Sequence, residues 1–73
     1  MKIIKKTLDI GSVLQSSDGS NQYKVTREYI GGNGAKIIVY QIINEDGTLD
    51  KFQYLAERQT IEEGIQSNRI KLI

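Results

Sequence analysis

The side chains that carry out most enzyme chemistry are missing from this chain, which has 73 residues and neither His nor Cys. Their absence removes the commonest general base, the commonest transition-metal ligand and the best nucleophile. Carboxylates remain, and Asp46 with Asp50 is a spacing that suggests a pair for acid–base work or for a divalent ion. Both fall in a turn and its adjoining strand, where solvated carboxylates are the simpler explanation. We therefore predict that the chain is not an enzyme and has no catalytic, metal or cofactor site.

The segment Gly31-Gly32-Asn33-Gly34 has the composition of a phosphate-binding loop. It lacks the Gly-Lys-Ser/Thr ending of a P-loop and the third glycine of a dinucleotide fingerprint. The residues that follow are typical of a strand, so no helix N-terminus is there to hold an anion. Because Gly and Asn adopt positive φ at low cost, we interpret the segment as the turn of a β-hairpin.

Binding of single-stranded nucleic acid is the alternative function. Small β-barrels bind single strands by stacking bases on exposed aromatic side chains within a basic groove. The residues suited to this are Arg27, Tyr29, Lys36 and Arg58. Two observations count against it. The net charge is only +1, and with one Phe and no Trp the chain needs most of its four Tyr residues for the core.

Residues 35–43 (Ala-Lys-Ile-Ile-Val-Tyr-Gln-Ile-Ile) form the longest apolar run in the sequence. The run is rich in β-branched and aromatic side chains, which predicts a strand covered on both faces, or nearly so. Residues 22–30 alternate between apolar and polar side chains, which predicts an antiparallel partner with one buried face. The two strands and the glycine-rich turn together predict a long hairpin at the centre of the fold.

A two-residue turn at Gly32-Asn33 would fix the register of this hairpin, and a turn at Asn33-Gly34 would give the same faces. The first register pairs Tyr23 with Ile42, Val25 with Tyr40 and Arg27 with Ile38. One face, the predicted core, then holds Tyr23, Val25, Tyr29, Ile38, Tyr40 and Ile42. The other face shows three apolar residues of the central strand, Ile37, Val39 and Ile43. We predict that these three bind a partner, because exposed apolar patches usually mark such contacts. The alternative is a cover within the chain by Leu55, Ile61 and Ile65.

The remaining elements are shorter. Strands are predicted at residues 1–10 (a strand or an N-terminal arm), 12–15, 48–55 and 69–73. Thr60 and Glu63 match a capping box, which predicts the start of a short helix before the last strand. Asn68 suits the left-handed conformation that ends such a helix.

These elements predict one domain over residues 1–73, mainly β, with one short helix before the last strand. The expected architecture is a small five-stranded antiparallel barrel or a strongly curved sheet. The order of elements resembles that of SH3-like barrels, in which a short helical turn precedes the last strand. The resemblance is one of layout alone, since Trp is absent, and we assign no family.

We therefore expect a small, non-enzymatic protein-interaction module whose partner is another protein or a second copy of itself. A compact domain rich in Ile, Lys and Asn suggests an accessory or inhibitory protein of a phage or mobile element. The first six residues begin like a signal peptide, but the long apolar region that should follow is missing. No stretch approaches the roughly 20 apolar residues of a membrane span. We predict a cytoplasmic location without membrane contact, which the lack of Cys permits.

Overall fold

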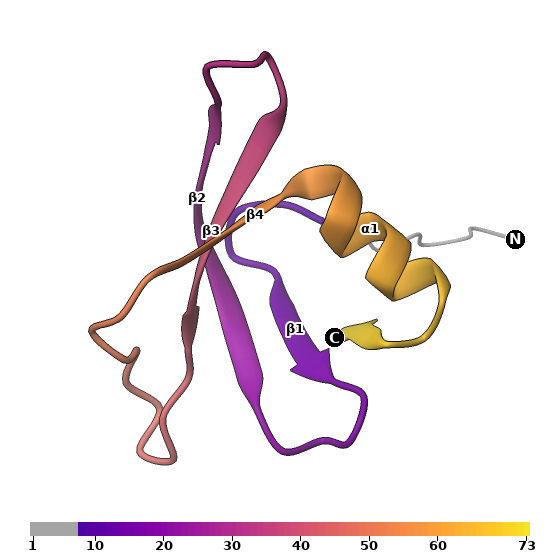
Figure 1. Cartoon of the computed structure of the whole chain (residues 1–73). Coiled ribbons are helices and arrows are strands. Elements are labelled where there is room, and N and C mark those ends of the chain that lie inside the picture. The colour runs from indigo at the N-terminus through magenta and orange to yellow at the C-terminus, as the bar shows by residue number, and fades with distance from the viewer. Residues whose placement is uncertain (1–7) are drawn as a thin grey trace, which may run out of the picture.

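The computed structural model describes residues 8–73, so most of the predicted N-terminal strand or arm lies outside the described residues. Residues 8–73 form five strands and one helix (Figure 1). In chain order these are β1 (Val13–Ser16), β2 (Gln22–Ile30), β3 (Lys36–Ile42), β4 (Tyr54–Glu57), α1 (Arg58–Gln66) and β5 (Ile70–Leu72).

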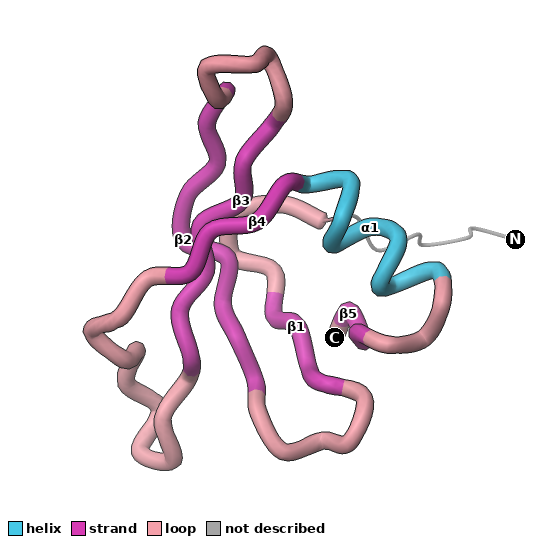
Figure 2. Tube along the Cα trace, in the orientation of Figure 1, coloured by secondary structure: helices cyan, strands magenta, loops and turns pink. Residues whose placement is uncertain are grey.

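The five strands form one antiparallel sheet in the order β4-β3-β2-β1-β5. The long β2–β3 hairpin occupies its centre, and α1 lies on one side of it (Figures 1 and 2). The prediction of a mainly β fold with one short helix before the last strand is confirmed. The sheet is open, because β4 and β5 are its two edges and do not pair with each other.

β4 is shorter than the predicted strand at residues 48–55. The amide of Asp50 donates a hydrogen bond to the Ile42 carbonyl at 2.8 Å. The Gln41 side chain then donates from Nε2 to the Asp50 carbonyl at 2.6 Å, in place of a backbone partner. Regular pairing with β3 resumes only at Tyr54, so the segment before β4 is a loop.

The β2–β3 hairpin has the predicted register near its base and a different one near its tip. Val25 faces Tyr40 and Tyr23 faces Ile42, as predicted. The turn, however, has three residues, because the Gly31 amide donates to the Ala35 carbonyl at 2.8 Å and Gly34 adopts a φ of 84°. A bulge between Val25 and Arg27 supplies the compensating shift of one residue.

Between the bulge and the turn, each side chain of β2 therefore lies on the face opposite to the predicted one. Tyr29 pairs with Ile37 and therefore lies on the face opposite the core, and Arg27 pairs with Val39 rather than with Ile38. The prediction that Tyr29 belongs to the core is wrong for this reason. Glu28 takes the position opposite Ile38 instead.

We call the face of the sheet that α1 covers the inner face, and the other the outer face. The buried cluster between the sheet and α1 consists of Leu8, Leu14, Val25, Ile38 and Ile61. Tyr23 and Tyr40 pack against it and are partly buried. Apart from Tyr29, the predicted core face of the hairpin is thus the inner face.

The helix begins at Arg58, two residues before the predicted capping box. Glu57 is the N-cap residue and makes no side-chain capping bond. The first turn is stabilised by Arg58, whose guanidinium contacts the Glu62 carboxylate at 3.0 Å and the Glu28 carboxylate at 2.9 Å. Asn68 follows the helix with a φ of 63°, the left-handed conformation predicted for it.

Gly64 permits the close approach of α1 and β5. A Cβ atom at this position would lie 2.6 Å from Cδ1 of Ile70. We predict that Gly64→Ala lowers the free energy of unfolding by about 1 kcal/mol, because overpacking costs about 1–3 kcal/mol and helix propensity returns about 1 kcal/mol. Urea unfolding measures the change.

Gly32→Ala is the matched control, since nothing lies within 4 Å of a Cβ there. The same Gly64→Ala change in an Ile70→Val background should cost less, because the crowded methyl group is gone. An unchanged unfolding midpoint for Gly64→Ala alone would contradict the close-packing argument.

Candidate interaction surfaces

The three residues predicted to bind a partner lie on or near the outer face, but they differ in exposure. Ile37 and Ile43 are half-buried, whereas Val39 is only 1% exposed. Val39 lies between Arg27 of β2 and Leu55 of β4 in the sheet register. Its central position between longer side chains leaves Val39 almost no surface to offer a partner.

The helix does not cover this face. Ile61 belongs to the buried cluster on the inner face, and Leu55 is part of β4 rather than of the helix. The proposed internal cover is therefore wrong for Ile61 and Ile65, which belong to the inner face; of the three, only Leu55 lies beside Val39. The predicted strand at residues 48–55 placed Leu55 outside the helix correctly, but its pairing with Val39 depends on the observed β3–β4 register.

The residues considered for nucleic-acid binding do not form one surface. The Arg27 guanidinium carbon lies 5.7 Å from the centre of the Tyr29 ring, a cation–π contact on the outer face. Lys36 is exposed and pairs with Ile30 near the hairpin tip. Arg58 is held on the helix side by two carboxylates. The structure therefore brings Arg27 and Tyr29 together and keeps Arg58 apart.

A row of three tyrosines crosses the inner face, one from each of three neighbouring strands. The ring centres of Tyr23 and Tyr40 lie 5.5 Å apart with the rings nearly perpendicular. Those of Tyr40 and Tyr54 lie 5.6 Å apart with the rings stacked. Tyr54, on edge strand β4, ends the row and is 41% exposed. Both geometries are favourable aromatic contacts, so we treat the three side chains as one feature, the tyrosine row.

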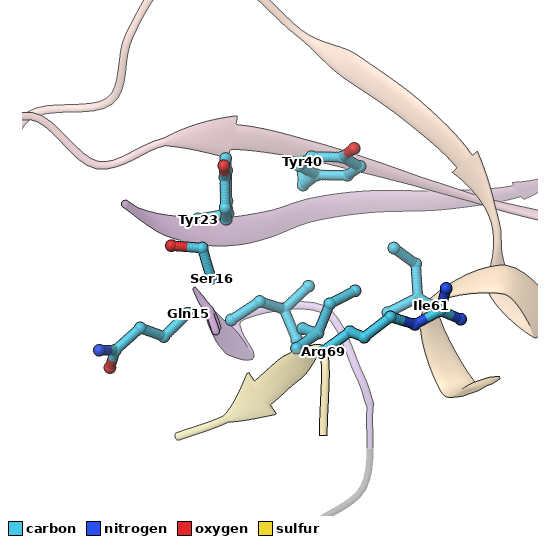
Figure 3. Close-up of a pocket in the computed structure, with 8 residues that line it drawn as sticks. Gln15, Ser16, Tyr23, Tyr40, Ile61 and Arg69 are labelled. Atoms are coloured by element: carbon cyan, nitrogen blue, oxygen red, sulfur yellow. The ribbon is translucent and has the colours of Figure 1, made fainter. Parts of the chain in front are cut away.

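A pocket of about 190 Å³ opens beside the tyrosine row. Its lining residues are Leu14, Gln15, Ser16, Tyr23, Tyr40, Ile61, Arg69 and Ile70. Figure 3 shows the Arg69 side chain running beside Ile61, across the pocket from the two tyrosines. The pocket thus combines aliphatic and aromatic walls with a cationic group, and we call it the tyrosine pocket.

Of the two charged groups near the tyrosine pocket, Asp18 has several hydrogen-bond donors, whereas Arg69 has no ion-pair partner in residues 8–73. Arg69 donates from Nε to the Ser67 hydroxyl at 2.9 Å, and no carboxylate within residues 8–73 forms an ion pair with it. Ser16 donates its hydroxyl to Asp18 at 2.8 Å. Hydrogen bonds from Ser20 and Ser16 lower the pKa of Asp18 to about 2, so this carboxylate stays ionised and already has its donors.

The surroundings of Tyr40 favour the neutral form of its phenol. Burial raises the pKa of Tyr40 above its ordinary value, and the neighbouring Tyr23 and Tyr54 raise it further. A neutral phenol can donate or accept a hydrogen bond at the pocket rim while its ring contacts apolar groups. The arrangement can therefore receive an apolar group that carries an anion at its edge.

The sequence reasoning missed this pocket, because its residues come from five separate parts of the chain. The one prediction related to the pocket is that Tyr23 and Tyr40 lie on the same face of the hairpin. Within the described residues, no three His, Cys, Asp or Glu side chains are grouped closely enough to hold a metal ion. Nor does any helix in residues 8–73 have the length and apolar character needed to cross a membrane.

The comparisons with known proteins give no further constraint. No protein-family model, no curated protein and no solved structure matches this chain. The assignment of a function therefore depends on the geometry of these surfaces.

Proposed function

We propose that this chain is a small, non-enzymatic protein-interaction module that binds an extended peptide segment of another protein at the tyrosine pocket. The observation that carries the proposal is an apolar pocket that adjoins both the tyrosine row and an Arg69 guanidinium without an ion-pair partner in residues 8–73. Pockets for whole small molecules measure about 300–1,000 Å³. The volume here, about 190 Å³, suits one anchoring side chain better than a cofactor.

The charge at the rim favours an acidic ligand. The guanidinium of Arg69 can donate two parallel hydrogen bonds to a carboxylate, and its position beside Ile61 puts that carboxylate next to the apolar anchor. Tyr54 extends the aromatic surface from the pocket to the sheet edge. The ligand we propose is therefore an extended peptide in which an apolar residue lies next to an Asp or Glu.

The same proposal includes an SH3-like layout for the domain. Its support is the order of elements, four strands followed by a helix and a last strand, together with the pairing of β5 with β1. An open sheet of this kind leaves the tyrosine pocket accessible between β1, β5 and the hairpin.

Selection from a displayed library of random peptides tests the proposal. We expect enriched sequences with an apolar residue next to an acidic one, and at least 10-fold weaker binding by Arg69→Glu, since hydrogen bonds to charged groups contribute about 1.5–3 kcal/mol. Arg27→Glu, the same charge change on the outer face, is the control and should bind as the wild type does. Equal binding by wild type and Arg69→Glu, or no enrichment, would refute this site.

Single-stranded nucleic acid is the second candidate ligand, and the cation–π pair of Arg27 and Tyr29 is the observation that favours it. On this proposal, retention on a single-stranded DNA column falls steeply between low and moderate salt. Arg27→Gln and Lys36→Gln should each reduce the salt slope by about one, whereas Arg58→Gln should not, because Arg58 already contacts two carboxylates. Failure to bind the column even at low salt would remove this candidate.

A further inference from the structure

Edge strand β4 and the loop before it expose an unusual share of apolar surface. The exposed large apolar side chains of the described residues are Ile10, Tyr29, Ile30, Leu49, Phe52, Tyr54, Leu55 and Ile73. Four of the eight therefore lie within residues 49–55, and Phe52 and Leu55 are 62% and 59% exposed. An apolar edge strand is a template for pairing with another strand.

The hydrogen-bond pattern of the sheet identifies the outward-facing backbone groups of β4. On β3, the backbone N–H and C=O groups of the odd-numbered residues are directed to β2, as the bond from the Ile43 amide to the Gln22 carbonyl at 2.8 Å indicates. The backbone groups of the even-numbered residues are therefore directed to the β4 side, as the bond from the Asp50 amide to the Ile42 carbonyl indicates. Antiparallel ladders alternate in this way. Tyr54, opposite Tyr40, hence directs its backbone groups to β3.

Leu55 and Glu57, the odd-numbered residues of β4, direct their N–H and C=O groups away from the sheet. Gln53 would take the same phase if residues 51–53 extended the strand. No strand of the described part of the chain pairs with this side of β4. The edge thus offers an alternating set of donors and acceptors to an incoming strand.

We propose that a second copy of this chain pairs with β4 in antiparallel orientation, forming a symmetric dimer in which Tyr54 faces Tyr54 of the second copy. In this register Lys51 of each copy faces Glu57 of the other. The Leu55 backbone then pairs with Gln53 of the second copy, so the outward-facing groups of both strands meet. Closed two-fold dimers of this kind use one surface twice.

Charge and chain geometry select this register. The helix begins at Arg58, so the added ladder cannot extend past Glu57. Lys51 is the only cationic residue from 49 to 57, and only this register places it opposite Glu57 on both sides of the dimer axis. A shift by two residues in either direction places an uncharged side chain opposite Glu57, which loses both favourable cross-strand pairs.

The aromatic residues fit the same register. Phe52 faces Ala56 of the second copy, so a large exposed ring meets a small side chain, and the two Tyr54 rings meet across the dimer axis. Residues 51–53 lack regular structure in the single chain, and in the dimer they extend β4. This proposal does not depend on the proposed peptide ligand, because no residue that lines the tyrosine pocket lies between 49 and 57.

Sedimentation equilibrium over a wide range of protein concentration tests the dimer. We expect the wild type to dimerise and Lys51→Glu to raise the dimer dissociation constant at least 10-fold, because two carboxylates then face each other. Glu57→Lys should have a similar effect by placing two ammonium groups together. The double variant Lys51→Glu/Glu57→Lys should restore dimerisation, and Lys36→Glu, an exposed Lys on the hairpin, is the matched control.

Three results would overturn the proposal: a wild-type monomer at the highest concentration, a dimer unaffected by either single variant, or a double variant that remains monomeric. Amide hydrogen exchange gives a second measurement that does not depend on substitution. The Leu55 amide should exchange more slowly at high protein concentration than at low concentration, whereas the exposed Ser17 amide should show no change. Equal exchange at Leu55 in the two conditions would also exclude pairing at this edge.

Discussion

The whole fold depends on two irregularities of the β2–β3 hairpin that compensate each other. The three-residue turn shifts the pairing by one residue, and the bulge between Val25 and Arg27 shifts it back. A shift of one residue moves every side chain to the opposite face. With the turn alone, Val25 would leave the buried cluster that it forms with Leu14 and Ile38. The bulge therefore makes a glycine-rich three-residue turn compatible with an apolar inner face.

The stretch between these irregularities also positions the helix. It turns Tyr29 outward and Glu28 inward, where Glu28 meets Arg58, the first residue of α1. Ile61 follows one turn later and enters the buried cluster. A partly exposed ion pair contributes little to stability, about 0–1 kcal/mol, so its main consequence is geometric. It lies where the helix begins over the hairpin, and Gly64 lets β5 approach the helix closely.

The sequence was sufficient for the parts of the fold that depend on local pattern. The alternation of residues 22–30 and the run at 35–43 predicted the hairpin and the pairing of Val25 with Tyr40. The bulge has no comparable sequence signal. Thr26, the residue without a partner in the register, resembles any other polar strand residue, and whether a bulge forms there depends on the pairing of β2 with β3. Thr60 matched a capping box, but the helix begins two residues upstream at Arg58, which contacts two carboxylates. The tyrosine pocket was beyond prediction, since it needs Arg69 and Tyr23 to meet in space.

Tyr54 belongs to both of the surfaces that the fold leaves accessible. Its ring stacks on Tyr40, which lines the tyrosine pocket, and its backbone belongs to β4, the edge strand that pairs with β3 on one side only within the described residues. A chain added at β4 would cover part of the exposed Tyr54 ring and leave Arg69 at the far side of the pocket untouched. The two surfaces therefore meet at one aromatic side chain while their charged groups, Lys51 with Glu57 and Arg69, remain separate. Because those charged groups are separate, the edge and the pocket can be altered independently even though the tyrosine row joins them.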